Sequence, residues 1–199
     1  MRPKPPGARF DRLHLSAYDS GVNTKPQGEQ HRETWDKQAL RHLLPYDDPF
    51  LFMDRVLTVE PDRLTAEWEA APDAFFFRGH FTGFPVVPAA ILFEGMGQAA
   101  SLLFRHAKGM PADTDILLHT LKDAHMRTPA FPGDLLHYEV RMQRSSAIAA
   151  RFAVRAWTAA AAIGDAEILL AMTSRTAFRS THRTGVTVGE NSPVRASPS

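Results

Sequence analysis

The chain has 199 residues, of which 44% are hydrophobic and 23% are charged, and its formal net charge is +1. These values are typical of a globular domain with a sizeable core, and they argue against a nucleic-acid binder, whose surface would carry a basic excess. The chain contains no cysteine, which excludes disulfide bonds, cysteine-ligated zinc and a thiol nucleophile.

The two ends of the chain differ in composition from the middle. Residues 1–31 are rich in proline, glycine and charge, which predicts a flexible extension. The first ten residues lack the apolar core of a secretory signal, so we expect a cytoplasmic protein. A single folded domain is expected over residues 32–180, followed by a disordered tail over residues 181–199.

The first elements of the domain are predicted from apolar spacing and from proline. Apolar residues at helical spacing, stopped by Pro45, predict a short helix over residues 33–44. Residues 49–59 have the composition of a buried strand. A turn at 61–62 and a second strand over 64–69 follow.

The most informative stretch, residues 78–98, reads Arg-Gly-His-Phe-Thr-Gly-Phe-Pro-Val-Val-Pro-Ala-Ala-Ile-Leu-Phe-Glu-Gly-Met-Gly-Gln. Pro88 suits the first turn of a helix, so we expect a helix from about Pro88 to Phe104. Its residues are apolar or small apart from Glu94, Gln98 and Ser101, which predicts a buried helix with a buried acid. Polar residues inside this run argue against a membrane span.

His80 and Glu94 form a candidate acid–base pair. Desolvation favours the protonated form of a buried carboxyl group, which can then donate a proton. A neutral imidazole in the preceding turn is a competent base at the same pH. For either residue alone, a purely structural role is an equally good interpretation.

The second half of the domain reads as a succession of strands. After a polar loop over 105–113, strands are expected at 114–126, 134–143, 147–159 and 166–178, with turns at 132–133, 144–146 and 163–165. Hairpin-like spacing implies an antiparallel sheet. The pattern therefore predicts an α+β fold in which one long helix lies against a curved antiparallel sheet.

Two rival motifs are weaker. Residues 95–100 satisfy a G-x-G-x-x-A dinucleotide fingerprint, but hairpins follow instead of a βαβ unit, and the glycines more plausibly permit close packing. Asp113, Asp115 and His119 lack a recognised metal-ligand spacing. We expect neither a cofactor nor a metal.

Three segments resemble the β-hydroxyacyl-ACP dehydratases of the FabZ type. Residues 79–89 and 94–98 are similar to the family's Gly-His-Phe-Pro-Gly-x-Pro-x-Met-Pro-Gly and Glu-Ala-Met-Ala-Gln motifs. Residues 44–56 are similar to Leu-Pro-His-Arg-Tyr-Pro-Phe-Leu-Leu-Val-Asp-Arg-Val, and residues 121–134 look like the strand after the helix. The related FabA type has Asp at the helix acid, so Glu94 favours FabZ. The resemblance implies the hotdog fold.

The resemblance also implies the reaction, dehydration of (3R)-3-hydroxyacyl-ACP to trans-2-enoyl-ACP in fatty acid or related lipid or polyketide biosynthesis. His80 would remove the C2 proton and Glu94 would protonate the departing hydroxyl. Unpaired N–H groups of Ala89 or Ala90 at the helix start, with Gly83, would bind the thioester oxygen. The supporting residues are Phe81, Phe84, Pro88 and Gln98.

The partners follow from the same resemblance. It implies a homodimer in which His80 of one subunit faces Glu94 of the other, with assembly into a trimer of dimers as an extension. The substrate would arrive on acyl carrier protein, which is acidic. Basic residues that could dock it, or that could equally belong to an ordinary solvated surface, are Arg78, Arg105, Lys108 and Arg127.

Departures from the family pattern leave alternatives open. Thr82, Phe84 and Ala89 alter the wall near His80, and Tyr46, Asp47 and Asp48 replace a basic stretch of the family. One alternative is a hotdog acyl-CoA thioesterase, which would not need the Gly-His-Phe turn. Another is a non-catalytic subunit of a heteromeric dehydratase.

Overall fold

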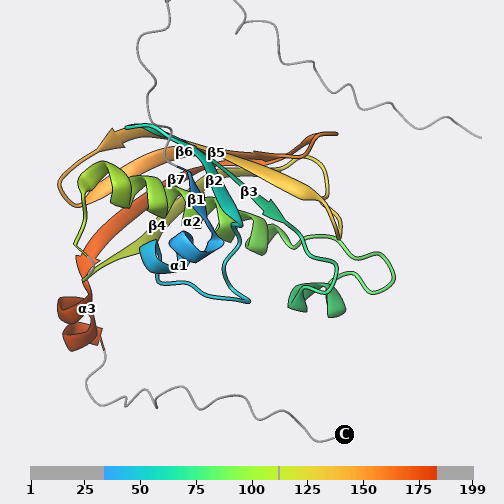
Figure 1. Ribbon diagram of the computed structural model, residues 1–199, viewed down its shortest axis with the longest axis horizontal. Helices are drawn as coiled ribbons and strands as arrows, with labels where there is room; N and C mark the ends of the chain where they lie inside the picture. Colours follow the sequence, from blue (N-terminus) through green and yellow to red (C-terminus); the bar gives the residue numbers. More distant parts are fainter. Residues whose placement is uncertain (1–33, 112, 183–199) are drawn as a thin grey trace, which may run out of the picture. The chain divides into compact units, whose positions relative to one another are not determined.

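The computed structural model describes residues 34–111 and 113–182 (Figure 1). The extension expected over 1–31 and residues 183–199 of the tail expected over 181–199 lie outside these residues. Residues 181–182, predicted to belong to the tail, are helical. The elements in chain order are β1 (Trp35–Asp36), α1 (Lys37–Leu43), β2 (Arg55–Val59), β3 (Arg63–Glu69), the 3₁₀ helix η1 (Phe75–Arg78), α2 (Ala89–Lys108), β4 (Thr114–Met126), β5 (Leu135–Ser145), β6 (Ala149–Trp157), β7 (Ala162–Ser174) and α3 (Arg175–His182).

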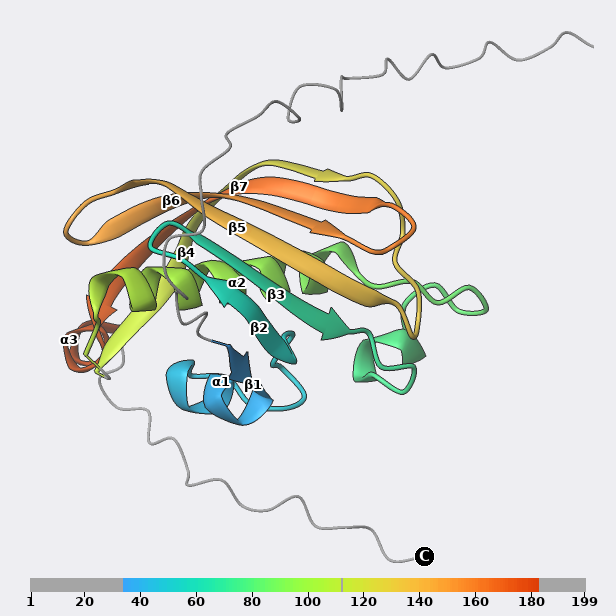
Figure 2. The same ribbon diagram turned by 45° about the horizontal axis from the view of Figure 1, so that its top comes forward.

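The strands form one antiparallel sheet in the order β1-β2-β3-β5-β6-β7-β4. Figures 1 and 2 show the sheet curving over α2, which runs along its concave side. The predicted α+β arrangement of one long helix and a curved antiparallel sheet is confirmed. Among the strands that the structure describes, β4 lies at one edge of the sheet and pairs with β7 alone.

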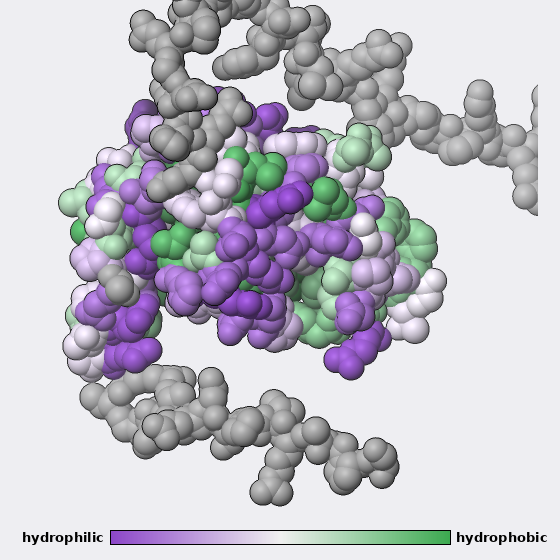
Figure 3. Space-filling view, in the orientation of Figure 1, coloured by the Kyte–Doolittle hydropathy of each residue, from purple (hydrophilic) through white to green (hydrophobic). Residues whose placement is uncertain are grey.

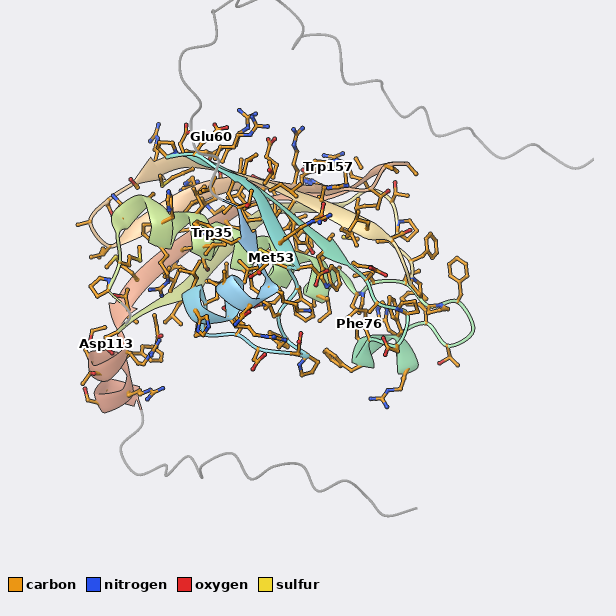
Figure 4. The ribbon with its side chains drawn as sticks, viewed as in Figure 1. Trp35, Met53, Glu60, Phe76, Asp113 and Trp157 are labelled. Atoms are coloured by element: carbon orange, nitrogen blue, oxygen red, sulfur yellow. The ribbon has the colours of Figure 1, made fainter. Side chains whose placement is uncertain are left out.

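The core lies between α2 and the sheet. The helix buries one long face, and its fully buried large side chains include Leu92, Met96 and Leu103. The segment before β2 covers the helix from another side, where Met53 is fully buried (Figure 4). Within residues 34–111 and 113–182, no helix is long and apolar enough to cross a membrane.

The helix α2 begins at the predicted place but ends later. Residues 105–108 were expected in a loop, and this prediction is wrong because they form its last turn. Gly109 ends the helix in the left-handed conformation, with φ 54°, and its N–H bonds the carbonyls of Arg105 and His106. Arg105, His106 and Lys108 suit the negative end of the helix dipole, which explains the extra turn.

The N-terminal helix is shorter than predicted. Trp35 and Asp36 form the two-residue strand β1 against β2, and α1 covers only Lys37–Leu43. Asp36 caps this helix, since its carboxylate accepts the Ala39 N–H at 2.8 Å.

The strand predicted over 49–59 is also shorter, because only Arg55–Val59 pairs with β3. Residues 49–54 are irregular. The Phe50 carbonyl and the Phe52 N–H are bonded instead to the side chain of Gln98, at 2.8 Å and 2.9 Å. A buried side chain has thus replaced a neighbouring strand as the partner of this backbone.

The last strand starts earlier and ends earlier than expected. The turn predicted at 163–165 is wrong, because these residues lie inside β7. A side chain at Gly164 would meet the His125 carbonyl at 2.8 Å, so the glycine permits close approach of β4 and β7. Residues 175–178, also predicted as strand, form the start of α3.

A hydrophilic surface covers α1 and the residues that follow it (Figure 3). Lys37 lies 3.1 Å from both Asp48 and Asp54, and Arg41 pairs with Asp47 at 2.8 Å and with Asp48. Asp47 and Asp48, which depart from the family pattern, therefore form ion pairs with basic residues of α1.

Candidate active site

His80 lies in the loop between η1 and α2 and is half-buried. Its Nδ1 is 2.9 Å from the carbonyl oxygen of Val86. Because a carbonyl oxygen only accepts hydrogen bonds, Nδ1 carries the proton in this contact. A neutral imidazole in this tautomer has its lone pair on Nε2, so Nε2 is the atom that can act as a base.

The same loop contains the expected wall residues. Phe81 adopts φ 53° and Gly83 adopts φ 85°, and the Phe84 N–H donates to the Phe81 carbonyl at 2.8 Å. The side chains of Phe81 and Phe84 are 63% and 62% exposed. Phe84 contacts Phe131 edge-on, with ring centroids 5.6 Å apart. The tight turn thus presents two aromatic rings at the surface beside His80.

The start of α2 supplies backbone donors. Pro88 is the N-cap residue, with φ −60° and ψ 138°, and no side chain caps the helix. Ala89 and Ala90 are exposed. The first N–H groups of a helix have no partner within it, so those of Ala89 and Ala90 are available to an oxygen atom at the positive end of the dipole.

Glu94 lies on α2 and lines a cavity of about 200 Å³. Within one chain Glu94 is half-buried, so it is less buried than the sequence predicted. The cavity is mostly apolar, and side chains of Phe93, Ile116 and Leu118 contribute to its lining. An apolar lining is suitable for an acyl chain.

Gln98 holds Glu94 in place and is itself fully buried. Its Oε1 accepts the Phe52 N–H, and its Nε2 donates to the Phe50 carbonyl and, at 3.1 Å, to Glu94 Oε1. These partners leave only one orientation of the amide, because an N–H faces each acceptor and the oxygen faces the donor. The predicted supporting role of Gln98 thus has a geometric basis.

His80 and Glu94 do not meet within one chain. His80 does not line the cavity that contains Glu94, and among the described residues no hydrogen bond or ion pair joins the two side chains. Each residue is positioned separately, His80 by Val86 and Glu94 by Gln98.

The rival motifs have structural explanations. A side chain at Gly95 would meet Tyr138 Oη at 2.6 Å, so this glycine of the dinucleotide fingerprint serves helix–sheet packing, as expected. The helix is followed by antiparallel strands. Asp115 pairs with Arg175 at 2.8 Å, and His119 lies 2.9 Å from the Thr120 hydroxyl.

Comparison with known proteins identifies the family. Residues 44–171 match the FabA-like domain family. The chain is 33% identical over 134 residues to the 3-hydroxyacyl-[acyl-carrier-protein] dehydratase FabZ of Solibacter usitatus, covering 67% of this chain and 83% of that protein. It is 34% identical over 142 residues to the Variovorax paradoxus FabZ, covering 70% and 95%. This chain belongs to the FabA-like family.

Solved structures of other proteins have the same fold as this FabA-like chain. The dehydratase heterocomplex ApeI:P from Xenorhabdus doucetiae has a TM-score of 0.61 at 12% identity, covering 72% of this chain and 97% of that chain. The fluoroacetyl-CoA thioesterase FlK has a TM-score of 0.54 at 15% identity, covering 63% and 96%. At these identities the likeness shows the fold alone, and it is the hotdog fold.

Sequence reasoning missed several residues of the FabA-like cavity. Tyr46 reaches it from the segment after α1, while Ile116, Leu118 and Leu121 reach it from β4. Tyr46 was noticed only as a departure from the family motif. The β4 leucines lie in the strand predicted over 114–126, for which no site residue was proposed, and Leu118 is 58% exposed at the sheet edge.

Proposed function

We propose that this chain dehydrates (3R)-3-hydroxyacyl-ACP to trans-2-enoyl-ACP, in fatty acid biosynthesis or a related lipid or polyketide pathway in the cytoplasm. The observation that carries the proposal is the position of Glu94, a carboxyl group held by Gln98 in a mostly apolar cavity. Family membership and the dehydratase activity named for the relatives support it.

The chemistry needs one base and one acid. His80 Nε2 takes the C2 proton, which the thioester carbonyl makes acidic, and Glu94 gives a proton to the C3 hydroxyl as it leaves as water. The elimination neither oxidises nor reduces the substrate, so no redox cofactor is required. Negative charge develops on the thioester oxygen, where the N–H groups of Ala89 and Ala90, with that of Gly83, serve as donors.

The active unit in this proposal is a homodimer. β4 is a 13-residue edge strand whose exposed apolar side chains include Leu117, Leu118 and Leu121. A long edge strand with unpaired backbone groups and exposed apolar side chains is typical of a protein–protein interface. The cavity that contains Glu94 is lined by Leu118 and Leu121 of this edge, so we propose that a second copy bound here supplies the His80 that faces Glu94. Assembly of three such dimers is a further prediction.

Acyl carrier protein is the proposed partner. The four basic residues considered for its docking do not form one patch on a subunit. Arg78 precedes α2 and Lys108 ends it, and a helix of 20 residues is about 30 Å long. Arg127 pairs with Asp165, and Arg105 donates to the Thr114 carbonyl at 2.6 Å. Arg78 lies closest in the chain to His80 and is exposed, so we favour it for docking.

Incubation of the purified chain with 3-hydroxyacyl-ACP tests the function. We expect 2-enoyl-ACP to form, and the His80→Ala and Glu94→Gln variants to lose roughly 10²–10⁴-fold in rate while keeping the wild-type melting temperature. Release of free acyl carrier protein thiol by wild type would identify a thioesterase instead. No turnover by wild type, with full activity after addition of a second FabA-like subunit, would identify a non-catalytic subunit.

A further inference from the structure

Two cavities of the chain share one wall. Beside the cavity that contains Glu94 lies a second cavity of about 530 Å³, formed between the end of α1, the start of β4 and α3. Tyr46 and Ile116 line both cavities. The second cavity is lined by apolar residues, among them Leu43 and Leu117, and also by the charged residues Arg105, Asp115, Arg175 and Arg179.

Tyr46 interacts electrostatically with one acidic residue from each cavity. Its ring is half-buried and packs against the core. Burial raises the pKa of the Tyr46 hydroxyl, and the negative charges of Glu94 and Asp115 raise it further. Glu94 belongs to the first cavity and Asp115 to the second, so the hydroxyl lies within electrostatic reach of both.

The two residues of the wall, Tyr46 and Ile116, belong to different kinds of backbone structure. Ile116 is part of β4 and is paired in register with Met172 of β7, so its position follows from the sheet. Tyr46 belongs to the irregular segment between α1 and β2. A substitution at Tyr46 can therefore open the wall without disturbing the pairing of strands.

The two cavities differ in size, and the wall separates the smaller one from the larger one. The cavity with Glu94 is smaller than the roughly 300–1,000 Å³ of ordinary small-molecule pockets, whereas the second cavity falls within that range. Because Tyr46 and Ile116 line both cavities, a chain that extends from Glu94 into the larger space has to pass these two residues.

We propose that Tyr46 is the end wall of the acyl pocket and limits the length of the acyl chain that the protein accepts. The ligand class is the linear acyl chain of a thioester, and the second cavity would take its distal methylene groups once the wall is removed. The inference rests on the proposed function, since it assumes that the cavity with Glu94 receives the acyl chain.

Binding of unreactive probes tests the wall separately from catalysis. S-alkyl pantetheine thioethers of increasing chain length cannot be dehydrated, and their affinities are measured for the full chain and its variants. With Tyr46→Ala, we expect the affinity for thioethers longer than the wild-type optimum to rise by about tenfold or more, while the affinity for shorter ones changes little. With Tyr46→Trp, we expect the optimum to shift to shorter chains.

Two control variants complete the design. Tyr46→Phe removes only the hydroxyl and should keep the wild-type length profile. Leu43→Ala enlarges the second cavity without opening the wall, because Leu43 lines only that cavity, and it should also keep the wild-type length profile. The Trp variant retains a large ring, so it reports on the wall even where the Ala variant fails to fold.

The outcomes separate the two proposals. The proposal that Tyr46 limits chain length is overturned if folded Ala and Trp variants at Tyr46 bind thioethers with the wild-type dependence on length, or with affinities scaled equally at all lengths. This holds even when wild type dehydrates 3-hydroxyacyl-ACP. A shifted profile supports the wall, even when no variant forms enoyl product and the proposed reaction fails.

Discussion

The side-chain amide of Gln98 lies 3.1 Å from Glu94 Oε1 and also holds the backbone of Phe50 and Phe52. One buried residue therefore joins the candidate acid to the segment that covers α2. Chemistry and stability are coupled at this position, because the same three hydrogen bonds serve both.

Gln98→Met should reduce both stability and rate. The substitution keeps a similar volume but leaves the Phe52 N–H and the Phe50 carbonyl without their partner, at a cost of about 2–4 kcal/mol in unfolding free energy. Glu94 also loses its donor, so kcat should fall more than KM changes. Urea unfolding and steady-state kinetics measure the two effects.

The control is Ser101→Ala, which removes a hydroxyl that donates to the Gly97 carbonyl. Its cost in unfolding free energy should be well below that of Gln98→Met. A fully stable Gln98→Met variant would contradict this account.

Mixed dimers should reveal whether the site is shared between subunits. His80→Ala and Glu94→Gln homodimers would both be inactive. A mixed dimer would keep one intact site, made from His80 of one subunit and Glu94 of the other. After random exchange of subunits at equal amounts, we expect about a quarter of wild-type activity, since half of the dimers are mixed and each has one of two sites. Activity that stays at background after verified exchange would rule out a shared site.

Leu118→Asp should weaken dimer formation. Leu118 is 58% exposed on the edge strand β4, and burial of a carboxylate between two copies would be unfavourable. Light scattering after size exclusion should show a shift toward monomer. The matched control is Ile148→Asp in the turn between β5 and β6, where the side chain is 66% exposed and β7 separates the residue from β4. If both variants stay dimeric, the interface lies elsewhere.

Gly95→Ala and Gly97→Ala should have opposite effects on stability. A Cβ at Gly95 would meet the hydroxyl oxygen of the buried Tyr138 at 2.6 Å and its ring at 3.0 Å, and such overpacking costs typically 1–3 kcal/mol. A Cβ at Gly97 has nothing within 4 Å, so the gain in helix propensity of about 1 kcal/mol should remain. Thermal denaturation compares the two variants directly, and equal melting temperatures would show that α2 shifts to admit the methyl group.

The ion pairs of Glu139 should make stability depend on acidic pH. Burial alone would raise the pKa of this carboxyl group, but hydrogen bonds from Arg141, Arg155 and Arg63 outweigh it and lower the pKa to about 2, from an ordinary value of 4.5. Because the folded pKa is depressed, this stabilisation is present above about pH 4.5 and is lost as the pH falls toward 2.

Urea unfolding as a function of pH measures that dependence. Glu139→Gln should remove on the order of 2 kcal/mol at neutral pH and flatten the profile below pH 4.5, with some of the effect screened at the half-exposed arginines. The control is Glu60→Gln, an exposed carboxylate in the turn between β2 and β3 (Figure 4). Profiles of equal slope for wild type and Glu139→Gln would mean that other groups cause the acid sensitivity.

Much of the fold could be predicted from local patterns. The helix start after Pro88 and the strand over 114–126 follow from proline and from apolar spacing, which report on the conformation of a few neighbouring residues. The candidate residues His80 and Glu94 were found in the same way, because motif and spacing lie within one short stretch. Gly164 misled this reasoning, since a glycine for close packing looks the same as a glycine for a turn.

The contacts between segments that are distant in sequence were decided only by the tertiary structure. Gln98 bonds to Phe52 across 46 residues of sequence, and Tyr46 and Ile116 line the same two cavities. The sequence by itself determined a buried helix with a polar pair and an antiparallel sheet. The separation of His80 from Glu94 within one chain, and the exposed edge at β4, depend on how the sheet curves around α2, which no window of sequence contains.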